Sequence, residues 1–111
     1  MLKIYKIPAQ NLKYVKAILE SPDRKDPKTG KWIANEWALR GYKLVEARSL
    51  NLESTDSYLQ IDAGEDFFKR NEKQILDAGA ISLSGAEFEN LKERFKKSEE
   101  TAQEGFGAIF G

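Results

Sequence analysis

The sequence predicts a mixed α+β domain with four strands in one antiparallel sheet. Four segments alternate apolar and polar residues as strands do, namely residues 2–8, 42–50, 57–63 and 80–84. The segments between them carry apolar residues three and four positions apart, which is the spacing of an amphipathic helix. The chain has 111 residues, of which 41% are hydrophobic and 11% aromatic, enough for one modest core. We therefore expect a single domain.

The first strand ends at Pro8, because proline cannot donate a hydrogen bond to a sheet. Leu2 and Ile4 share one of its faces, and Tyr5 and Ile7 share the other. A helix over residues 9–21 follows, and its apolar side consists of Leu12, Val15, Ile18 and Leu19. It stops at Ser21-Pro22, since the residue before a proline avoids the helical conformation.

The stretch Pro22–Lys31 is polar and rich in turn-forming residues, so it predicts a loop. The next segment, residues 31–41, predicts a short second helix. In this helix Trp32, Ile33 and Trp37 would lie along one side, and Gly41 would occupy the C-terminal cap.

The strands at residues 42–50 and 57–63 should pair as an antiparallel hairpin across the turn between them. In the second strand, Leu59, Ile61 and Ala63 would share one face and Tyr58 the other. A third helix begins at Gly64 with two acidic residues in its first turn, which the helix dipole favours. Its core residues would be Phe67, Phe68, Ile75 and Leu76, with the end of the helix at Gly79.

After the strand at residues 80–84, the chain shows its clearest helix start. Ser84 and Glu87 have the spacing of a capping box, and Leu83 with Phe88 fits a hydrophobic staple. The helix that follows would bury Phe88, Leu91 and Phe95.

Without the extra short helix in the first crossover, the order of elements is βαββαβ. This order is the split βαβ, or ferredoxin-like, arrangement, with helices on one face of a four-stranded sheet. We assign residues 1–104 to this domain and residues 105–111 to a glycine- and aromatic-rich C-terminal tail. The face left open would carry Lys43, Tyr58 and Gln60, and we expect it to serve self-association as a homodimer.

The composition excludes several chemistries. The chain has no cysteine and no histidine, so disulfides, cysteine nucleophiles and histidine general bases are impossible. Lysine plus arginine and aspartate plus glutamate both number 18, a zero net charge that argues against a general nucleic-acid binder. The sequence shows neither an apolar leader nor a run long enough to span a membrane, so we expect a cytoplasmic protein. A charged fraction of 32% without cysteine is compatible with a thermophilic source.

Three groups of residues are candidate sites within the domain. Asp62, Glu65 and Asp66 could hold Mg²⁺, but we favour the simpler explanation that Glu65 and Asp66 complement the helix dipole and that Asp62 is solvated beside them. A basic loop beside an aromatic ring could grip a phosphate and stack a base, or could simply be solvated. Its residues are Arg24, Lys25, Lys28 and Lys31, followed by Trp32. The two tryptophans, Trp32 and Trp37, could line a ligand cleft or an interface, or could belong to the core.

The tail is a fourth candidate site. Gln103, Phe106, Ile109 and Phe110 have a spacing that resembles the sliding-clamp-binding box, with Phe106 in place of its aliphatic residue and Ile109 in place of its first aromatic. Exposing such a tail forgoes roughly 1.5–3 kcal/mol of burial for each large apolar side chain. Three alternatives follow for the tail: it docks on its own domain or a dimer mate, it is offered to another protein, or it is disordered.

From these patterns we expect a small interaction or regulatory protein that is not an enzyme and needs no cofactor. Its contact element would be the C-terminal tail, and its partner a protein or a second copy of the chain. The alternative is a nucleotide-, small-molecule- or RNA-binding domain that uses residues 24–31 with Trp32. A carboxylate enzyme with Mg²⁺ is a third class.

Overall fold

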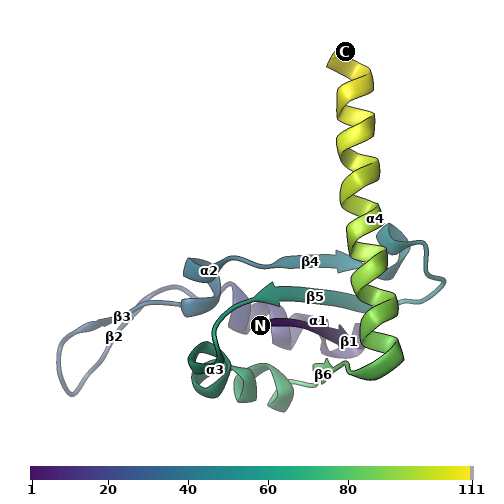
Figure 1. The fold of residues 1–111 in the computed structure, drawn as a ribbon. Coiled ribbons are helices and arrows are strands. Elements are labelled where there is room, and N and C mark those ends of the chain that lie inside the picture. Colours follow the sequence, from purple (N-terminus) through teal and green to yellow (C-terminus); the bar gives the residue numbers. More distant parts are fainter. Residues whose placement is uncertain (111) are drawn as a thin grey trace.

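The structure is a computed structural model that describes the backbone of residues 1–110 and the side chains of residues 1–100. It confirms a mixed α+β domain with a four-stranded antiparallel sheet and four α-helices in the described part of the chain (Figure 1). The sheet strands are β1 (Leu2–Ile7), β4 (Lys43–Glu46), β5 (Ser57–Asp62) and β6 (Ile81–Ser82). The α-helices are α1 (Leu12–Leu19), α2 (Glu36–Arg40), α3 (Glu65–Asp77) and α4 (Gly85–Phe110).

The strands lie in the order β4-β5-β1-β6, and every neighbouring pair is antiparallel. The long central pair joins β1 to β5, with Tyr5 opposite Leu59. β4 pairs with the other edge of β5, which confirms the hairpin expected between residues 42–50 and 57–63. β4 is shorter than expected, because residues Ala47–Leu50 turn into a 3₁₀ helix, η2. A second short 3₁₀ helix, η1 (Ala9–Asn11), leads into α1.

One face of the sheet is covered by α1 and α3. The larger core cluster joins residues of β1 and β5 to the buried sides of these helices: Tyr5, Ile7, Leu59, Ile61, Val15, Leu19, Phe67, Phe68 and Ile75. Leu76, expected in this core, is instead 38% exposed. The rest of the expected inward side of α3 is confirmed, since Phe67, Phe68 and Ile75 are buried in this core on one side of the helix.

A polar cluster lies at the edge of this core. Glu72 of α3 accepts hydrogen bonds from Lys3 Nζ at 2.7 Å and from Tyr5 Oη at 2.6 Å. Burial alone would raise the pKa of Glu72, but the hydrogen bonds from Lys3 and Tyr5 outweigh it and hold this pKa below its ordinary value. Burial and the adjacent carboxylate raise the pKa of Tyr5. The cluster therefore fastens the strand to α3 with a charged carboxylate.

The other face of the sheet is covered by α4, which corrects the expectation that helices lie on one face only. Ile4 and Tyr58 point to this face and pack with Leu91 and Phe95 of α4. Lys43, also on this face, forms an ion pair with Glu99 of α4. Because Tyr58 is buried and Lys43 is paired, this face is not open for the self-association we expected. Beyond the sheet, the backbone of α4 runs on to Phe110, away from the body of the domain (Figure 1).

The first crossover differs from the expected short helix over residues 31–41. Trp32–Ile33 form strand β3, which pairs with β2 (Arg24–Lys25) in a separate two-stranded hairpin. Only Glu36–Arg40 are helical, and they form α2. The side chain of Asn35 caps this helix, so the helix begins after Asn35 and the residues before it keep an extended backbone in the hairpin.

Candidate binding surface

The β2–β3 hairpin extends from the body of the domain at the end opposite to β6 (Figure 1). Its turn is held by two backbone hydrogen bonds: the Asp26 amide donates to the Lys31 carbonyl and the Gly30 amide to the Asp26 carbonyl, both at 2.8 Å. The Asp26 carboxylate also accepts from the Lys28 amide at 2.9 Å and from Thr29 Oγ1 at 3.1 Å. Gly30 has a φ of +70°, a conformation that glycine adopts without strain. The sequence DPKTGK thus folds as a tight turn.

The hairpin exposes one large aromatic side chain among several cations. Trp32 is 72% exposed and Ile33 is 41% exposed. The cations are Arg24, Lys25, Lys28 and Lys31, and none of them has an ion-pair partner among the side chains of residues 1–100. The single carboxylate of this segment, Asp26, is occupied in the turn, where the hydrogen bond from the Lys28 amide lowers its pKa. The exposed surface of the hairpin is therefore cationic and aromatic.

Asn35 fixes the hairpin to the domain. Its side-chain oxygen accepts from the amides of Trp37 and Ala38, the first two free N–H groups of α2 that it can reach. Its side-chain nitrogen donates to the carbonyls of Leu19 at 2.9 Å and Ser21 at 2.7 Å, where α1 ends. One amide side chain thus joins the end of α1 to the start of α2. The backbone N–H of Asn35 also donates to Asp23 Oδ1 at 2.9 Å, at the base of the hairpin.

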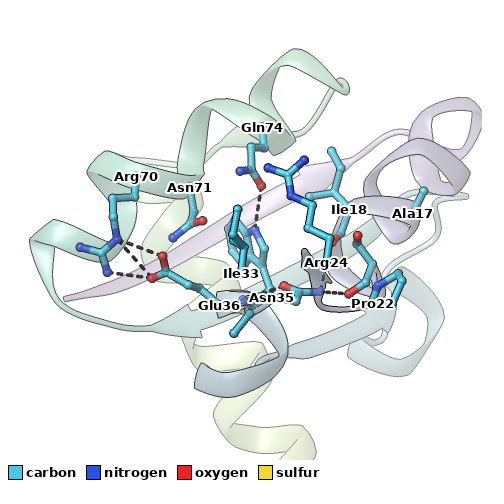
Figure 2. Close-up of a pocket in the computed structure, with 13 residues that line it drawn as sticks. Ala17, Ile18, Pro22, Arg24, Ile33, Asn35, Glu36, Arg70, Asn71 and Gln74 are labelled. Atoms are coloured by element: carbon cyan, nitrogen blue, oxygen red, sulfur yellow. Dashed lines mark hydrogen bonds and ion pairs between the residues drawn. The ribbon is translucent and has the colours of Figure 1, made fainter. Parts of the chain in front are cut away.

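A cleft of about 480 Å³ lies at the base of the hairpin, between α1, α2 and α3 (Figure 2). Trp37 is buried beneath it and donates its indole N–H to Gln74 Oε1 at 3.4 Å. Ala17, Ile18, Pro22 and Ile33 form apolar parts of its wall, and Arg24 and Asn71 add polar groups. The cleft therefore combines apolar surface with a small number of polar groups, as ligand sites do.

An ion pair borders the cleft on the α2 side. Arg70 of α3 donates from Nη2 to Glu36 Oε2 at 2.7 Å and from Nε to Glu36 Oε1 at 3.0 Å (Figure 2). These hydrogen bonds lower the pKa of Glu36, and they raise the pKa of Arg70. The two-point geometry positions both side chains, although such exposed pairs add little stability.

The structure separates the two tryptophans that sequence reasoning placed on one helix side. Trp37 is 1% exposed and belongs to the core, where its ring contacts Phe67 edge-on, whereas Trp32 is exposed on the hairpin. Arg24 and Trp37 both line the cleft, so these two candidates are brought together. Lys25, Lys28 and Lys31 stay with Trp32 on the hairpin.

The three acidic candidates have separate partners or surroundings. Asp62 pairs with the amino group of Met1 at 3.1 Å, and Glu65 pairs with Lys69 one turn along α3. Within the described residues, no three acidic side chains gather closely enough to hold a metal ion. Glu65 and Asp66 lie in the first turn of α3, as expected from the helix dipole.

Sequence reasoning missed several side chains of this surface: Asn35, Glu36, Arg70 and Gln74. A signal for Asn35 was present, because an asparagine followed by glutamate is typical of a helix start. No comparable signal exists for the contacts of Glu36 with Arg70 and of Trp37 with Gln74, which join residues more than 30 positions apart.

The tail candidates Gln103, Phe106, Ile109 and Phe110 have side chains outside the described part, so the prediction that they contact a partner stays a prediction. Among the described residues, no helix combines the length and the apolar character needed to cross a membrane. Comparison with known proteins gives no match, whether with protein-family models, curated proteins or solved structures.

Proposed function

We propose that this chain is a non-catalytic interaction domain that binds an acidic segment of a partner protein through the β2–β3 hairpin. The observation that carries this proposal is the exposure of Trp32, 72%, between cations that have no ion-pair partner among residues 1–100. A tryptophan left in water forgoes apolar burial, so it is an expensive residue to place at the surface without a partner.

The energetics fit a protein interface. Tryptophan and arginine are the side chains most enriched at the energetic centres of interfaces, and burying one large apolar side chain gives about 1.5–3 kcal/mol. The cations of the hairpin would speed association with an acidic partner and make it dependent on salt. Ile33, beside Trp32, extends the apolar contact.

A single-stranded nucleic acid is the competing occupant, since bases stack on aromatic rings and phosphates attract lysines. Against it, the net charge of the whole chain is zero and the hairpin provides only four cations. We therefore favour the protein partner and let the experiment separate the two.

The experiment is a selection of displayed random octapeptides on the immobilised full chain. We expect enrichment of peptides that combine acidic with aromatic or aliphatic residues, and at least tenfold weaker binding of these peptides to Trp32→Ala. Ile81→Ala is the matched control, because Ile81 is another exposed apolar side chain but lies on β6, far from the hairpin (Figure 1).

A fluorescein-labelled (dT)₁₂ strand tests the competing occupant by anisotropy. If it binds tightly, loses affinity in salt and depends on Trp32, the partner is a nucleic acid and our proposal is wrong. If no peptide is enriched on the wild-type chain, the proposal is also wrong.

We also propose that the fold is the ferredoxin-like arrangement. Read across the sheet, the order β4-β5-β1-β6 places the second, third, first and fourth strands of the chain side by side, and every neighbouring pair is antiparallel, which fits the split βαβ pattern. The crossover helices α1 and α3 contribute to the same core cluster, and α4 is then an addition on the opposite face.

The C-terminal segment is a second candidate contact element. The direction of the α4 backbone favours it, because the helix continues beyond the sheet and carries residues 105–110 away from the domain (Figure 1). A segment so placed would be offered to a partner protein rather than packed on its own core. Removal of residues 105–111 should then leave the folded domain intact and reduce recovery of that partner.

A further inference from the structure

The cleft at the base of the hairpin is continuous with a second cavity. This cavity, of about 600 Å³, lies further along α1, and Ala17, Ile18 and Gln74 line both. The first cavity reaches Ser21 and the second reaches Asn11, so together they form a groove along the whole of α1, beside α3. We call this the α1–α3 groove.

The length of the groove suits a short extended peptide. The eight residues of α1 span about 12 Å at 1.5 Å per residue. An extended chain advances about 3.3 Å per residue, so roughly four residues would cover the helix. A groove of this length is longer than a small anion needs.

The two ends of the groove differ in charge. Arg24 lies at the hairpin end, where no carboxylate within residues 1–100 pairs with it. The far end is lined by Asp77 and by Tyr14, whose ring is 55% exposed. An arginine can bind a carboxylate with two parallel hydrogen bonds. The hairpin end therefore suits an acidic residue, and the far end a residue that is not acidic.

Polar groups between the ends suit a peptide backbone. Gln74 uses its side-chain oxygen for the Trp37 indole, so its amide N–H groups remain as donors. Asn71 is 7% exposed and uses its side-chain nitrogen for the Phe67 carbonyl, while its oxygen makes no hydrogen bond with the described residues. An extended peptide presents the complementary carbonyl and N–H groups. Ala17 and Ile18 add apolar surface for its side chains.

We infer that the α1–α3 groove receives an extended segment of the partner protein, with an aspartate or glutamate of that segment on Arg24. The inference rests on the proposed function, since it names the part of the partner that would bind next to the hairpin. The hairpin would bind the flanking part of the partner through Trp32. The groove would select the types of residue next to the acidic residue that binds Arg24.

A variant in which a larger side chain fills the groove tests the inference. Ala17 is exposed on α1 and lines both cavities, so Ala17→Trp should block the groove without disturbing the core. Lys16→Trp is the matched control, because Lys16 is exposed on the same helix and lines neither cavity. For the octapeptides enriched on the wild-type chain, we expect at least tenfold weaker binding to Ala17→Trp and less than twofold change for Lys16→Trp. Melting curves of both variants confirm that they are folded.

A mutant cycle tests the contact at Arg24. The acidic residue of an enriched peptide is replaced by asparagine or glutamine, its uncharged counterpart. This replacement should weaken binding to the wild-type chain about tenfold, but should change binding to Arg24→Gln less than twofold. An acidic preference that survives in Arg24→Gln would overturn the inference.

The remaining outcomes separate the inference from the proposed function. If Trp32→Ala abolishes peptide binding while Ala17→Trp binds like Lys16→Trp, the hairpin is the site and the groove is not. If no peptide is enriched on the wild-type chain, both fail. If the wild-type chain self-associates in sedimentation and Ala17→Trp alone becomes monomeric, the groove binds a second copy, and the inference of a foreign segment is wrong.

Discussion

Replacement of Asn35 by alanine tests how the hairpin and the groove are held together. Alanine removes the cap of α2, which costs about 1 kcal/mol, with a range of roughly 0.5–2 kcal/mol. It also removes the donor that satisfies the Leu19 and Ser21 carbonyls at 2.9 and 2.7 Å, and each such hydrogen bond contributes about 1 kcal/mol. Water can replace part of the contact to the exposed Ser21 carbonyl, so we expect a total loss of about 2–3 kcal/mol.

For a chain of this size, a loss of this magnitude lowers the melting temperature by roughly 10–20 °C. The measurement is thermal and urea unfolding of Asn35→Ala and the wild-type chain, followed by circular dichroism. Asn90→Ala is the control. Asn90 is an exposed asparagine of α4 whose side chain, among residues 1–100, makes one hydrogen bond, accepted from Arg94 at 3.3 Å. Its loss should therefore lower the midpoint by no more than a few degrees.

A third variant, Asn35→Asp, separates the two halves of the contact. Aspartate keeps the oxygen that caps α2, but it cannot donate to the carbonyls of Leu19 and Ser21 and places a negative charge beside them. We therefore expect Asn35→Asp to be less stable than the wild-type chain even though aspartate is a good helix cap. A melting temperature of Asn35→Ala within about 2 °C of the wild type would refute the role of this residue as the link between α1 and α2.

Three further predictions concern the rest of the domain. The lowered pKa of Glu72 means that its carboxylate stabilises the fold above the ordinary pKa of 4.5 and that this stabilisation is lost as the pH falls through the folded pKa. Glu72→Gln should therefore melt earlier than the wild type at pH 7, and the difference in melting temperature should shrink as the pH falls below 4.5. A gap that persists unchanged at low pH would contradict this assignment. Gly79→Ala should lower the free energy of unfolding in urea by about 2 kcal/mol, because φ is +104° and the added Cβ would collide with the side chain of Asn11. A loss near zero would show instead that the loop adapts to the added methyl group. A chain cut after Glu104 should melt within about 2 °C of the full chain, because the described core contacts of α4 end before this point; a drop of roughly 10 °C would show instead that the tail packs on the domain.

The strands were predictable because each has its own local pattern. The hairpin of β4 and β5 follows from alternation in residues 57–63, and the inward side of α3 follows from its helical spacing. The position of α4 did not follow from its own apolar residues, since periodicity tells which side of a helix is buried but not against what. The available signal lay in the strands, where neighbouring residues that point to opposite faces are both hydrophobic: Ile4 with Tyr5, and Tyr58 with Leu59. All four are buried in the structure. Strands that are apolar on both faces belong to a sheet covered on both sides.

The hairpin was missed because Ile33 and Trp37 have helical spacing by coincidence. The turn-forming residues Asp26, Pro27 and Gly30 were recognised, but a loop was inferred where they close a two-stranded hairpin. The basic residues and Trp32 were identified as a candidate site from the sequence. Their exposure, and the groove to which Arg24 belongs, depend on long-range packing between α1 and α3 that a single sequence does not reveal.

The most direct test of the central claim uses ¹⁹F NMR on the chain labelled with 5-fluorotryptophan. The two tryptophans give two signals, and Trp32→Phe assigns them, because Trp32 is exposed and its replacement leaves the core intact. On addition of an enriched acidic octapeptide, we predict that the Trp32 signal shifts and loses its sensitivity to D₂O while the signal of the buried Trp37 keeps its solvent insensitivity. A peptide that binds without moving the Trp32 signal would contradict the claim that the hairpin is the contact surface.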